Sequence, residues 1–267
     1  MIIEISSSDN AFIKHLKQME RRKYREKHKE YIAEGVRILY DALENKQTIK
    51  SAVFCDALYR TAGGESLLTR LVDQGIRVYH IPEKLYAEIA DTESPQGIMA
   101  VLPRIQINLG QLLKKENGLY ILLDRVQDPG NLGTIIRTAD AAGVDAVLLT
   151  KGCVDVYNPK TIRSTMGSIF HLPILILEDQ QEAQDFFKSN QIRILTTSLS
   201  AKCYHYEIDY RQAAAIVVGN EANGVSDLWM EAADDLVKIP ILGKAESLNV
   251  STAASIMLYE AVRQRME

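Results

Sequence analysis

Polar and small residues follow two short apolar runs near the C-terminal end of the chain. Gly219 to Glu221 comes directly after the run 214–218, and a loop that ends in Ser247 to Asn249 comes after the run 236–239. An apolar run that stops at turn-forming residues is typical of a buried strand, and open α/β sheets bind ligands where strand ends meet helix starts. The amide, hydroxyl and carboxylate groups of the two loops are therefore expected to wall one polar pocket.

The chain lacks the residue patterns of several other kinds of site. Neither Gly-x-Gly-x-x-Gly, typical of dinucleotide sites, nor Gly-x-x-x-x-Gly-Lys-Ser/Thr, typical of nucleotide triphosphatases, occurs in it. The five histidines show no metal-ligand spacing, and the three cysteines lie too far apart for a Cys-x-x-Cys site. We therefore predict no metal, no dehydrogenase-like nucleotide site, and reduced core thiols at Cys55, Cys153 and Cys203.

A composition of 46% hydrophobic and 25% charged residues is ordinary for a soluble globular protein, and 267 residues are enough for two domains. The chain has no apolar run approaching the roughly 18 residues that cross a bilayer. Its first ten residues do not have the basic start and apolar core of a signal peptide. A cytoplasmic protein with no membrane partner is expected.

A segment near the N-terminus is much more basic than the chain as a whole. Between Lys14 and Lys29 the chain has eight Lys or Arg against two Glu, a local charge of +6 in a protein whose net charge is −4. Such a density predicts contacts with phosphates, although the solvated face of a helix is the alternative. The helix is expected to start after Asn10. The candidate RNA-binding residues are Lys14, Lys17, Arg21, Arg22, Lys23 and Arg25.

Strands alternate with helices along nearly the whole chain, which predicts an α/β fold. The first block, 1–103, is a smaller α/β domain; 104–117 is a polar linker; the second block, 118–267, forms another α/β domain. In the second block we predict a helix over 134–142 that ends at Gly143, a helix over 160–168 whose Arg163 lines the same cleft as the loops, and a terminal helix over 248–263.

Three motifs of the second block then appear in order. D-x-x-x-D-P-G-N-L-G-T-I-I-R-T-A-D-A-A-G covers 124–143, G-N-E-x-x-G covers 219–224, and I-P-x-x-G at 239–243 precedes S-L-N-V-S-x-A at 247–253. Together they resemble the motifs of the SpoU (TrmH) RNA ribose methyltransferases. The first hundred residues resemble, less specifically, the ribosomal-protein-like RNA-binding domain often fused ahead of that family, most clearly at Tyr31 to Gly35.

The resemblance implies a fold and an activity. It implies a mainly parallel sheet whose C-terminal segment forms a deep trefoil knot, S-adenosylmethionine bound within the knot, and a homodimer through the catalytic domain. It also implies methyl transfer to a ribose 2'-oxygen of RNA, with large-subunit rRNA favoured over tRNA by the N-terminal domain. The alternative is a catalytically silent RNA-binding or ribosome-assembly protein of the same fold. The presence of Arg137, Glu221 and Asn249 favours the enzyme.

The resemblance also assigns residues to the cofactor. Backbone groups at the ends of the knot strands are expected to contact the adenine and the methionine parts of S-adenosylmethionine. They belong to Thr197, Gly219, Ile239 and Leu248. For Ile239 and Leu248, packing in the core is a compatible second role.

Five residues are implied for catalysis: Arg137, Asn131, Glu221, Ser247 and Asn249. A guanidinium stays protonated, so we expect Arg137 to hold a phosphate and to stabilise the developing alkoxide rather than to act as a base. The alternatives are ordinary structural roles. They are an ion pair of Arg137 with Glu221 or Asp140, helix capping by Asn131 or by Ser247, and an ordinary loop carboxylate at Glu221.

Overall fold

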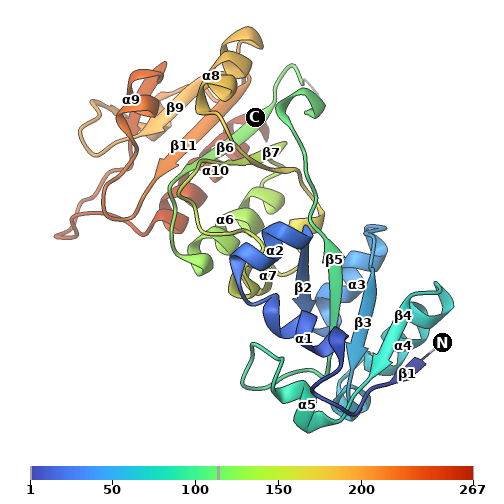
Figure 1. Ribbon diagram of the computed structural model, residues 1–267. Coiled ribbons are helices and arrows are strands. Elements are labelled where there is room, and N and C mark those ends of the chain that lie inside the picture. Colours follow the sequence, from blue (N-terminus) through green and yellow to red (C-terminus); the bar gives the residue numbers. More distant parts are fainter. Residues whose placement is uncertain (1, 113–114, 267) are drawn as a thin grey trace. The chain divides into compact units, whose positions relative to one another are not determined.

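The computed structural model describes residues 2–112 and 115–266, which form two compact units (Figure 1). The first unit contains the chain up to Ile105 together with Asp155–Phe170, and the second contains Gln106–Val154 and the chain from His171 onward. The segment Asp155–Phe170 thus packs with the first unit although it lies within the second block of the sequence. The predicted domain limits stay predictions, and the predicted linker 104–117 includes residues 113–114, which lie outside the described residues.

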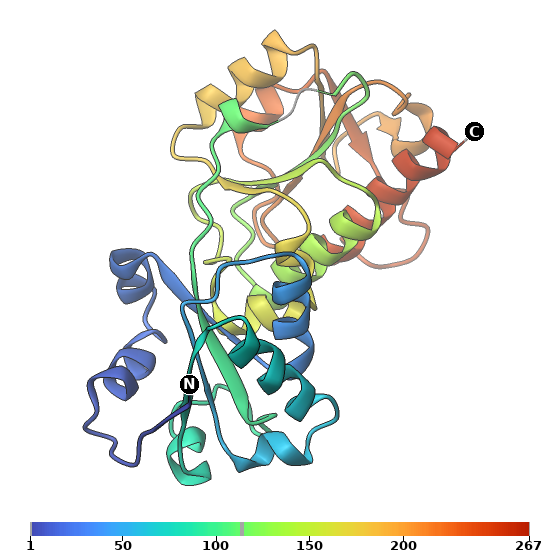
Figure 2. The same cartoon turned by 90° about the vertical axis from the view of Figure 1, so that its right-hand side faces the viewer.

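The first unit has a five-stranded sheet in the order β1-β4-β3-β5-β2. Its elements are β1 (Ile2–Glu4), α1 (Ala11–Gln18), α2 (Arg22–His28), β2 (Glu30–Glu34), α3 (Val36–Glu44), β3 (Ser51–Phe54), α4 (Gly64–Asp73), β4 (Arg77–His80), α5 (Glu83–Ala87), β5 (Ile98–Pro103) and α7 (Pro159–Thr165). Figure 2 shows α1 and α2 on one side of the sheet and α3 and α4 on the other. Val53 of β3 and the alternate residues Met99 and Val101 of β5 pack with α1 and α5 in one buried cluster.

The basic segment is divided between two helices, whereas the sequence predicted one. Asn10 caps α1 as expected, since its side chain accepts a hydrogen bond from the amide of Phe12. The apolar stripe of this helix ends at Met19, and no apolar residue follows it before Tyr24. A continued helix would therefore bury nothing, and the chain instead turns and starts α2 at Arg22.

The second unit has a seven-stranded sheet in the order β10-β12-β9-β11-β6-β7-β8, in which every neighbouring pair is parallel. Its elements are β6 (Leu119–Asp124), α6 (Pro129–Ala141), β7 (Ala146–Leu149), β8 (Ile174–Ile176), α8 (Gln180–Ser189), β9 (Arg193–Thr197), β10 (Cys203–Tyr204), β11 (Ala214–Gly219), α9 (Asp227–Glu231), β12 (Asp235–Lys238) and α10 (Val250–Met266). The predicted α/β class with a mainly parallel sheet is confirmed.

Helices cover both faces of this sheet. Phe187 of α8 and Trp229 of α9 pack with alternate residues of β6, β7 and β11 in one buried cluster. On the other face α10 packs against α6 and β11. The strand β11 lies between β6 and β9, so the carboxyl ends of β9, β11 and β12 come together at one edge of the sheet. The predicted knot stays a prediction. Within the described residues no helix is both long and apolar enough to cross a membrane.

Candidate functional site

A cavity of about 630 Å³ opens at the carboxyl ends of β9, β11 and β12, in the size range of small-molecule sites. Its walls come from 197–200 after β9, 218–225 around the end of β11, and 237–248 after β12, with the start of α10 closing it. The two loops that the sequence analysis placed around one pocket do line the same cavity.

All four residues predicted to contact the cofactor line this cavity: Thr197, Gly219, Ile239 and Leu248. The Thr197 hydroxyl donates to the carbonyl oxygen of Val217 at 3.0 Å, which ties the end of β9 to β11. Gly219 has no room for a side chain, because a Cβ atom there would lie 2.3 Å from the backbone of the 224–225 segment. The wall at Gly219 therefore consists of closely approaching backbone.

The loop after β11 is held in shape by Asn220, which is buried. Its Oδ1 accepts hydrogen bonds from the amides of Ala222 and Asn223, each at 3.0 Å, and its Nδ2 donates to the carbonyl oxygen of Arg125 at 2.9 Å. Backbone hydrogen bonds between Asn220 and Gly224 close the turn. One amide side chain thus shapes the cavity wall and joins it to the loop after β6.

Sequence reasoning assigned no role to Asp124, although it begins the first motif. Its carboxylate is 1% exposed; Oδ2 accepts from the amide of Ser226 at 2.7 Å, and Oδ1 accepts from the hydroxyl of Thr150 at 3.0 Å. Asp124 therefore fastens the end of β6 to the segment that leaves the cavity loop. An acid directly after a fully apolar strand was the available signal, because a buried carboxylate needs partners.

The helix α6 starts at Pro129, five residues before the predicted start. Asp128 is its N-cap and accepts a hydrogen bond from the amide of Asn131, so the prediction that Asn131 caps this helix is wrong. Pro129 suits the first turn, where its missing N–H is not needed. Asn131 instead lies inside the first turn with its side chain free to reach other segments.

Asn131 joins two of the other predicted catalytic residues. Its Nδ2 donates to Glu221 Oε1 at 3.0 Å, and its Oδ1 accepts from Asn249 Nδ2 at 3.0 Å. Glu221 also accepts from the amide of Gln127 at 3.4 Å. Glu221 is therefore bonded to the start of α6, and both its catalytic role and the alternative of an ordinary loop carboxylate stay predictions.

Asn249, and not Ser247, caps the last helix. The Oδ1 of Asn249 accepts from the amides of Ser251 and Thr252 at 2.9 and 3.3 Å, and α10 begins at Val250, two residues after the predicted start. Ser247 is exposed and lines the cavity. Capping therefore does not account for Ser247.

Arg137 differs from the other predicted catalytic residues in its surroundings. It is exposed on α6, does not line the cavity, and has no hydrogen bond or ion pair within residues 2–112 and 115–266. The expected alternative partners are engaged elsewhere: Asp140 pairs with His171, and Glu221 pairs with Asn131. Because Arg137 follows Asn131 by six residues, it points about 120° away from Asn131 around the helix axis.

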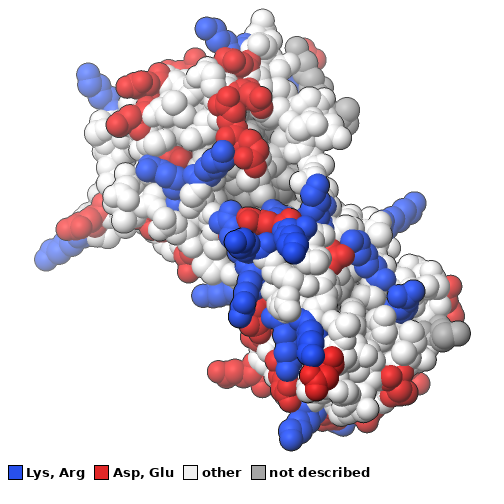
Figure 3. All heavy atoms as spheres, in the orientation of Figure 1, with Lys and Arg blue, Asp and Glu red and all other residues white. Residues whose placement is uncertain are grey.

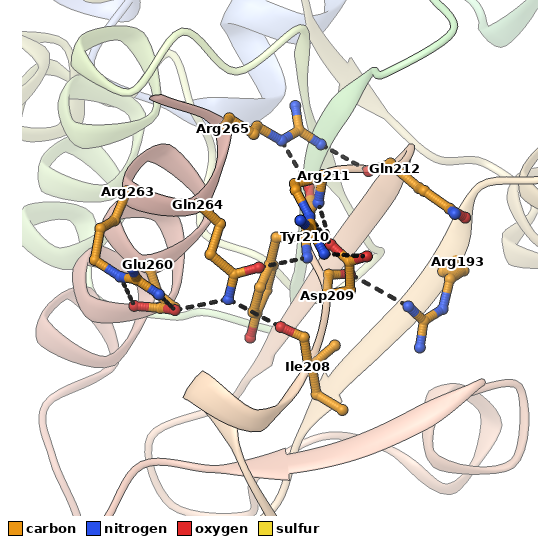
Figure 4. Close-up of polar contacts among 10 residues, drawn as sticks. All are labelled: Arg193, Ile208, Asp209, Tyr210, Arg211, Gln212, Glu260, Arg263, Gln264 and Arg265. Carbon is orange, nitrogen blue, oxygen red and sulfur yellow. Dashed lines mark hydrogen bonds and ion pairs between the residues drawn. The ribbon is translucent and has the colours of Figure 1, made fainter. Parts of the chain in front are cut away.

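The far end of α10 is anchored by a second group of hydrogen bonds, shown in Figure 4. The side chain of Gln264 donates to the carbonyl oxygen of Ile208 at 2.9 Å and accepts from the amide of Tyr210 at 3.0 Å. Arg265 donates to the carbonyl oxygens of Tyr210 and Gln212 at 2.7 and 2.8 Å. The helix whose start closes the cavity is thus fixed to the segment that enters β11.

Several cavity residues were missed by sequence reasoning. Ser198 and Ser200 add hydroxyl groups after β9, and Lys238 adds a cation whose Nζ lies 5.1 Å from the ring centroid of Tyr204. The polar run after the strand 193–197 was the available signal for the two serines. Arg163, predicted to line this cleft, instead belongs to the first unit and pairs with Asp91 at 2.5 Å. Within the described residues no cluster of His, Cys, Asp and Glu could hold a metal ion.

The six candidate RNA-binding residues have different surroundings in the first unit. Arg25 is only 2% exposed and pairs with Asp155, so its assignment to the RNA surface is wrong. The exposed ion pairs are Lys14–Asp9, Lys17–Glu88 and Arg22–Glu26. Arg21 and Lys23 are exposed, without such a partner in the described part of the chain. Figure 3 shows Lys and Arg gathered around α2 with acidic groups between them.

A parallel sheet whose strand ends open on a loop-walled cavity is typical of α/β proteins that bind a small ligand at this edge. Residues 118–259 match the SpoU rRNA Methylase family, and residues 10–100 match the MRM3-like substrate binding domain. The first match covers more than half of the chain. The chain therefore belongs to the SpoU rRNA methylase family.

Relatives match over nearly the full length. The chain is 35% identical over 256 residues to the 23S rRNA (guanosine(2553)-2'-O)-methyltransferase RlmP of Bacillus subtilis, covering 96% of this chain and 98% of that protein. The AdoMet-bound rRNA methyltransferase structure from Sinorhizobium meliloti has a TM-score of 0.89 at 32% identity, covering 98% of both chains. The AdoMet complex of AviRb from Streptomyces viridochromogenes has a TM-score of 0.87 at 30% identity, covering 96% and 99%.

Proposed function

We propose that this protein transfers a methyl group from S-adenosylmethionine to a ribose 2'-hydroxyl of RNA. The observation that carries the proposal is the convergence of family motifs on one cavity: six of the nine predicted cofactor and catalytic residues line it. Asn131 and Asn249 join it through hydrogen bonds. The AdoMet-bound relatives, similar over nearly their whole length, support the same cofactor.

The residues of the cavity fit S-adenosylmethionine. Leu248 lines the cavity with a partly exposed side chain and offers apolar surface for an adenine ring, and Gly219 adds backbone to the cavity wall. Carboxylates of Glu221 and Glu246 also line the cavity, which suits a positively charged ligand. When bound, S-adenosylmethionine supplies a methyl group activated by its sulfonium centre. The chain's own task is to place a ribose oxygen in line with that methyl group.

The proposed catalytic residues divide this task. Asn131 fixes Glu221 and Asn249 relative to each other at the mouth of the cavity, so the three side chains form a set that can orient the ribose. Ser247 adds a hydroxyl group on the cavity wall. Arg137 binds the RNA phosphate and stabilises the negative charge that develops as the 2'-hydroxyl loses its proton to phosphate or water.

The position of Arg137 supports a homodimer. An exposed arginine that does not line the cavity of its own chain could act at the cavity of a second copy. A two-fold dimer uses the same surface of both copies, so one contact would complete both sites. We therefore infer that two copies pair through the catalytic unit and that Arg137 acts across the interface.

Large-subunit ribosomal RNA is the proposed substrate. Relatives named as 23S rRNA 2'-O-methyltransferases match this chain over most of their length, and the N-terminal match is to a substrate-binding domain. Transfer RNA is the second candidate, because other relatives carry the name tRNA/rRNA methyltransferase. An rRNA substrate also supports the predicted cytoplasmic location.

Methyl transfer to purified RNA tests the proposal. The protein is incubated with S-adenosylmethionine labelled in the methyl group and with ribosomal RNA or transfer RNA from cells that lack the gene, and ribose methylations are then mapped. We expect one 2'-O-methylated nucleotide in large-subunit rRNA that is also missing from those cells. Label in neither RNA would support the catalytically silent alternative, and label only in tRNA would move the substrate to that class.

A further inference from the structure

We propose that Tyr24 and His28 of α2 form a stacking site for an unpaired RNA base. The inference rests on the proposed function for its ligand class. It adds a recognition element that the charge of the basic segment did not indicate. The two rings lie four residues apart on one helix, so their side chains share one face.

The geometry of the two rings is that of a stack. Their centroids are 4.1 Å apart and their planes are inclined by 29°. Tyr24 is half-buried, whereas His28 is exposed. Tyr24 therefore backs His28, and the open ring of His28 offers a surface on which a further flat group can be placed. Nucleic-acid bases have such faces, and stacking on aromatic side chains is the usual way in which proteins hold unpaired bases.

Interactions behind the stack hold it in place. The hydroxyl of Tyr24 lies 3.0 Å from His15 Nδ1, and His15 Nε2 lies 2.8 Å from Glu30 Oε2. The other oxygen of Glu30 accepts from Lys50 Nζ at 2.5 Å. The ring of His15 also meets His28 edge-on, with centroids 5.4 Å apart. Because one ring is fixed by hydrogen bonds, less side-chain freedom is lost when a base binds.

Cations run alongside the stack. Lys23 and Lys27 are also four residues apart, one position before each ring, so they form a neighbouring row on α2. Both are exposed, and neither has an ion pair within the part of the chain that the structure describes. An RNA segment with one base stacked on His28 can therefore place its phosphates beside Lys23 and Lys27. In a duplex the base faces are covered by neighbouring pairs, so an unpaired segment is the ligand that fits both rows.

The helix that carries both rows is rigidly attached to the first unit. Arg25 lies in sequence between the residue pairs 23–24 and 27–28 but is buried, and its Nε and Nη2 donate to Asp155 Oδ2 at 3.0 and 2.7 Å. Its Nη1 donates to the carbonyl oxygens of Met19 and Glu20 at the turn between α1 and α2. Arg25 thus fixes α2 to the first unit, while Lys23, Lys27 and His28 of the same helix are exposed.

Binding of two RNA probes separates stacking from charge. The probes are a single-stranded oligoadenylate of about twelve nucleotides and an RNA duplex of the same length. Their affinities are measured at several salt concentrations for the wild type and for His28→Ala, His28→Phe and Lys27→Ala. Thermal melting of each variant shows whether it is folded, which is expected because both side chains are exposed.

We expect His28→Ala to weaken oligoadenylate binding about tenfold at every salt concentration, with the duplex affected less than twofold. His28→Phe keeps a flat ring and should retain the affinity, whereas Lys27→Ala should flatten the salt dependence. Unchanged binding by His28→Ala, an equal loss on the duplex, or an equal loss with His28→Phe would each overturn the stacking site.

The experiment also separates this inference from the proposed function. Methyl transfer by the wild type together with normal oligoadenylate binding by His28→Ala would remove the stacking site and leave the activity. The opposite result is a selective loss of oligoadenylate binding by His28→Ala together with no methyl transfer by the wild type. It would show an RNA-binding protein that has the stacking site but not the activity. Failure of the wild type to bind oligoadenylate at all would refute the stacking site directly.

Discussion

Asn131 connects three segments that are far apart in the sequence. Its side-chain nitrogen donates to Glu221, and its side-chain oxygen accepts from Asn249. Each partner therefore binds a different atom of the same amide. The bonds span 90 and 118 residues of chain. Arg137, on the same helix, has no comparable bond within the described residues and remains available to a ligand. The helix α6 thus carries one residue that joins the two loops of the cavity and one whose side chain is exposed.

Arg137→Ala should abolish methyl transfer while leaving the affinity for S-adenosylmethionine within severalfold. The expected loss in kcat is about a hundredfold or more, as for removal of other groups that stabilise developing negative charge. The cofactor should still bind, because Arg137 does not line the cavity. Single-turnover methylation and calorimetric titration of the cofactor measure the two effects. Arg137→Lys is the control that keeps the charge, and weak cofactor binding by the alanine variant would contradict the assigned role.

At the scale of elements, the turn between α1 and α2 depends on one buried ion pair. Arg25 and Asp155 have side chains only 3% and 5% exposed, and their atoms approach to 2.7 Å. Breaking such a pair leaves a charge buried without its partner. Asp155 is the first residue of the segment Asp155–Phe170, which packs with the first unit although the chain on both sides of it belongs to the second. The ion pair therefore joins parts of the first unit that are distant in sequence.

Arg25→Met should lower the free energy of unfolding by about 3–5 kcal/mol. The matched control is Arg22→Met on the same helix, whose exposed pair with Glu26 should contribute about 0–1 kcal/mol. Urea unfolding followed by circular dichroism measures both variants. Equal, small losses for the two would show that the buried pair does not hold the turn.

His80 should make the stability of the first sheet depend on pH. Burial lowers the pKa of His80, but hydrogen bonds to Glu4 and Asp56 outweigh burial and raise the pKa above its ordinary value. A raised pKa in the folded state stabilises the fold below the unfolded pKa of about 6.5, and this contribution is lost as the pH rises through the folded value. Glu4 belongs to the edge strand β1, so the loss should loosen that strand.

The melting temperature of the wild type should therefore exceed that of His80→Gln by more at about pH 6 than at about pH 8.5. The double variant Glu4→Gln/Asp56→Asn lacks both partners of His80. Its melting temperature should therefore also fall below that of the wild type by more at about pH 6 than at about pH 8.5. A gap between wild type and His80→Gln that is constant across this range would contradict the role of the two carboxylates.

At the scale of the whole molecule, recognition and chemistry are assigned to different units. The aromatic and basic rows lie on α2 of the first unit, and the cavity lies at the strand ends of the second. If Arg137 serves the cavity of a second copy, the working molecule needs two chains. The two proposals can be tested independently, because one concerns RNA affinity and the other concerns assembly.

A mixed dimer tests whether Arg137 acts across an interface. Gly219→Val should disable the cavity of its own chain, since even a Cβ atom would collide with backbone there. Arg137→Ala and Gly219→Val chains are each expected to be inactive alone. When the two chains are co-expressed, about half of the dimers contain one chain of each kind, and each of these has one complete site out of two. About a quarter of the wild-type activity should therefore return. Continued inactivity of the mixture, or an active monomer by light scattering on dilution, would contradict the shared site.

Much of the architecture follows from the sequence alone. Apolar runs located β11 and β12, and Asn10 and Gly143 marked helix limits because their signals are local. The order of the three motifs identified the family and the loops around the cavity. The strands β1 and β10 and the helix α9 were missed, since segments of two to five residues have too few positions to show a period.

Only the tertiary structure decided which charged and polar side chains have partners. Arg25 lies in the same basic segment as Arg21, Arg22 and Lys23. Its partner Asp155, 130 residues away, makes it a buried residue of the fold. Asn131 resembles a helix cap until Glu221 and Asn249 are brought beside it. Local patterns report the burial and the backbone preference of a segment. A hydrogen bond or an ion pair between distant segments depends on where folding brings their atoms, which the order of residues along the chain does not express.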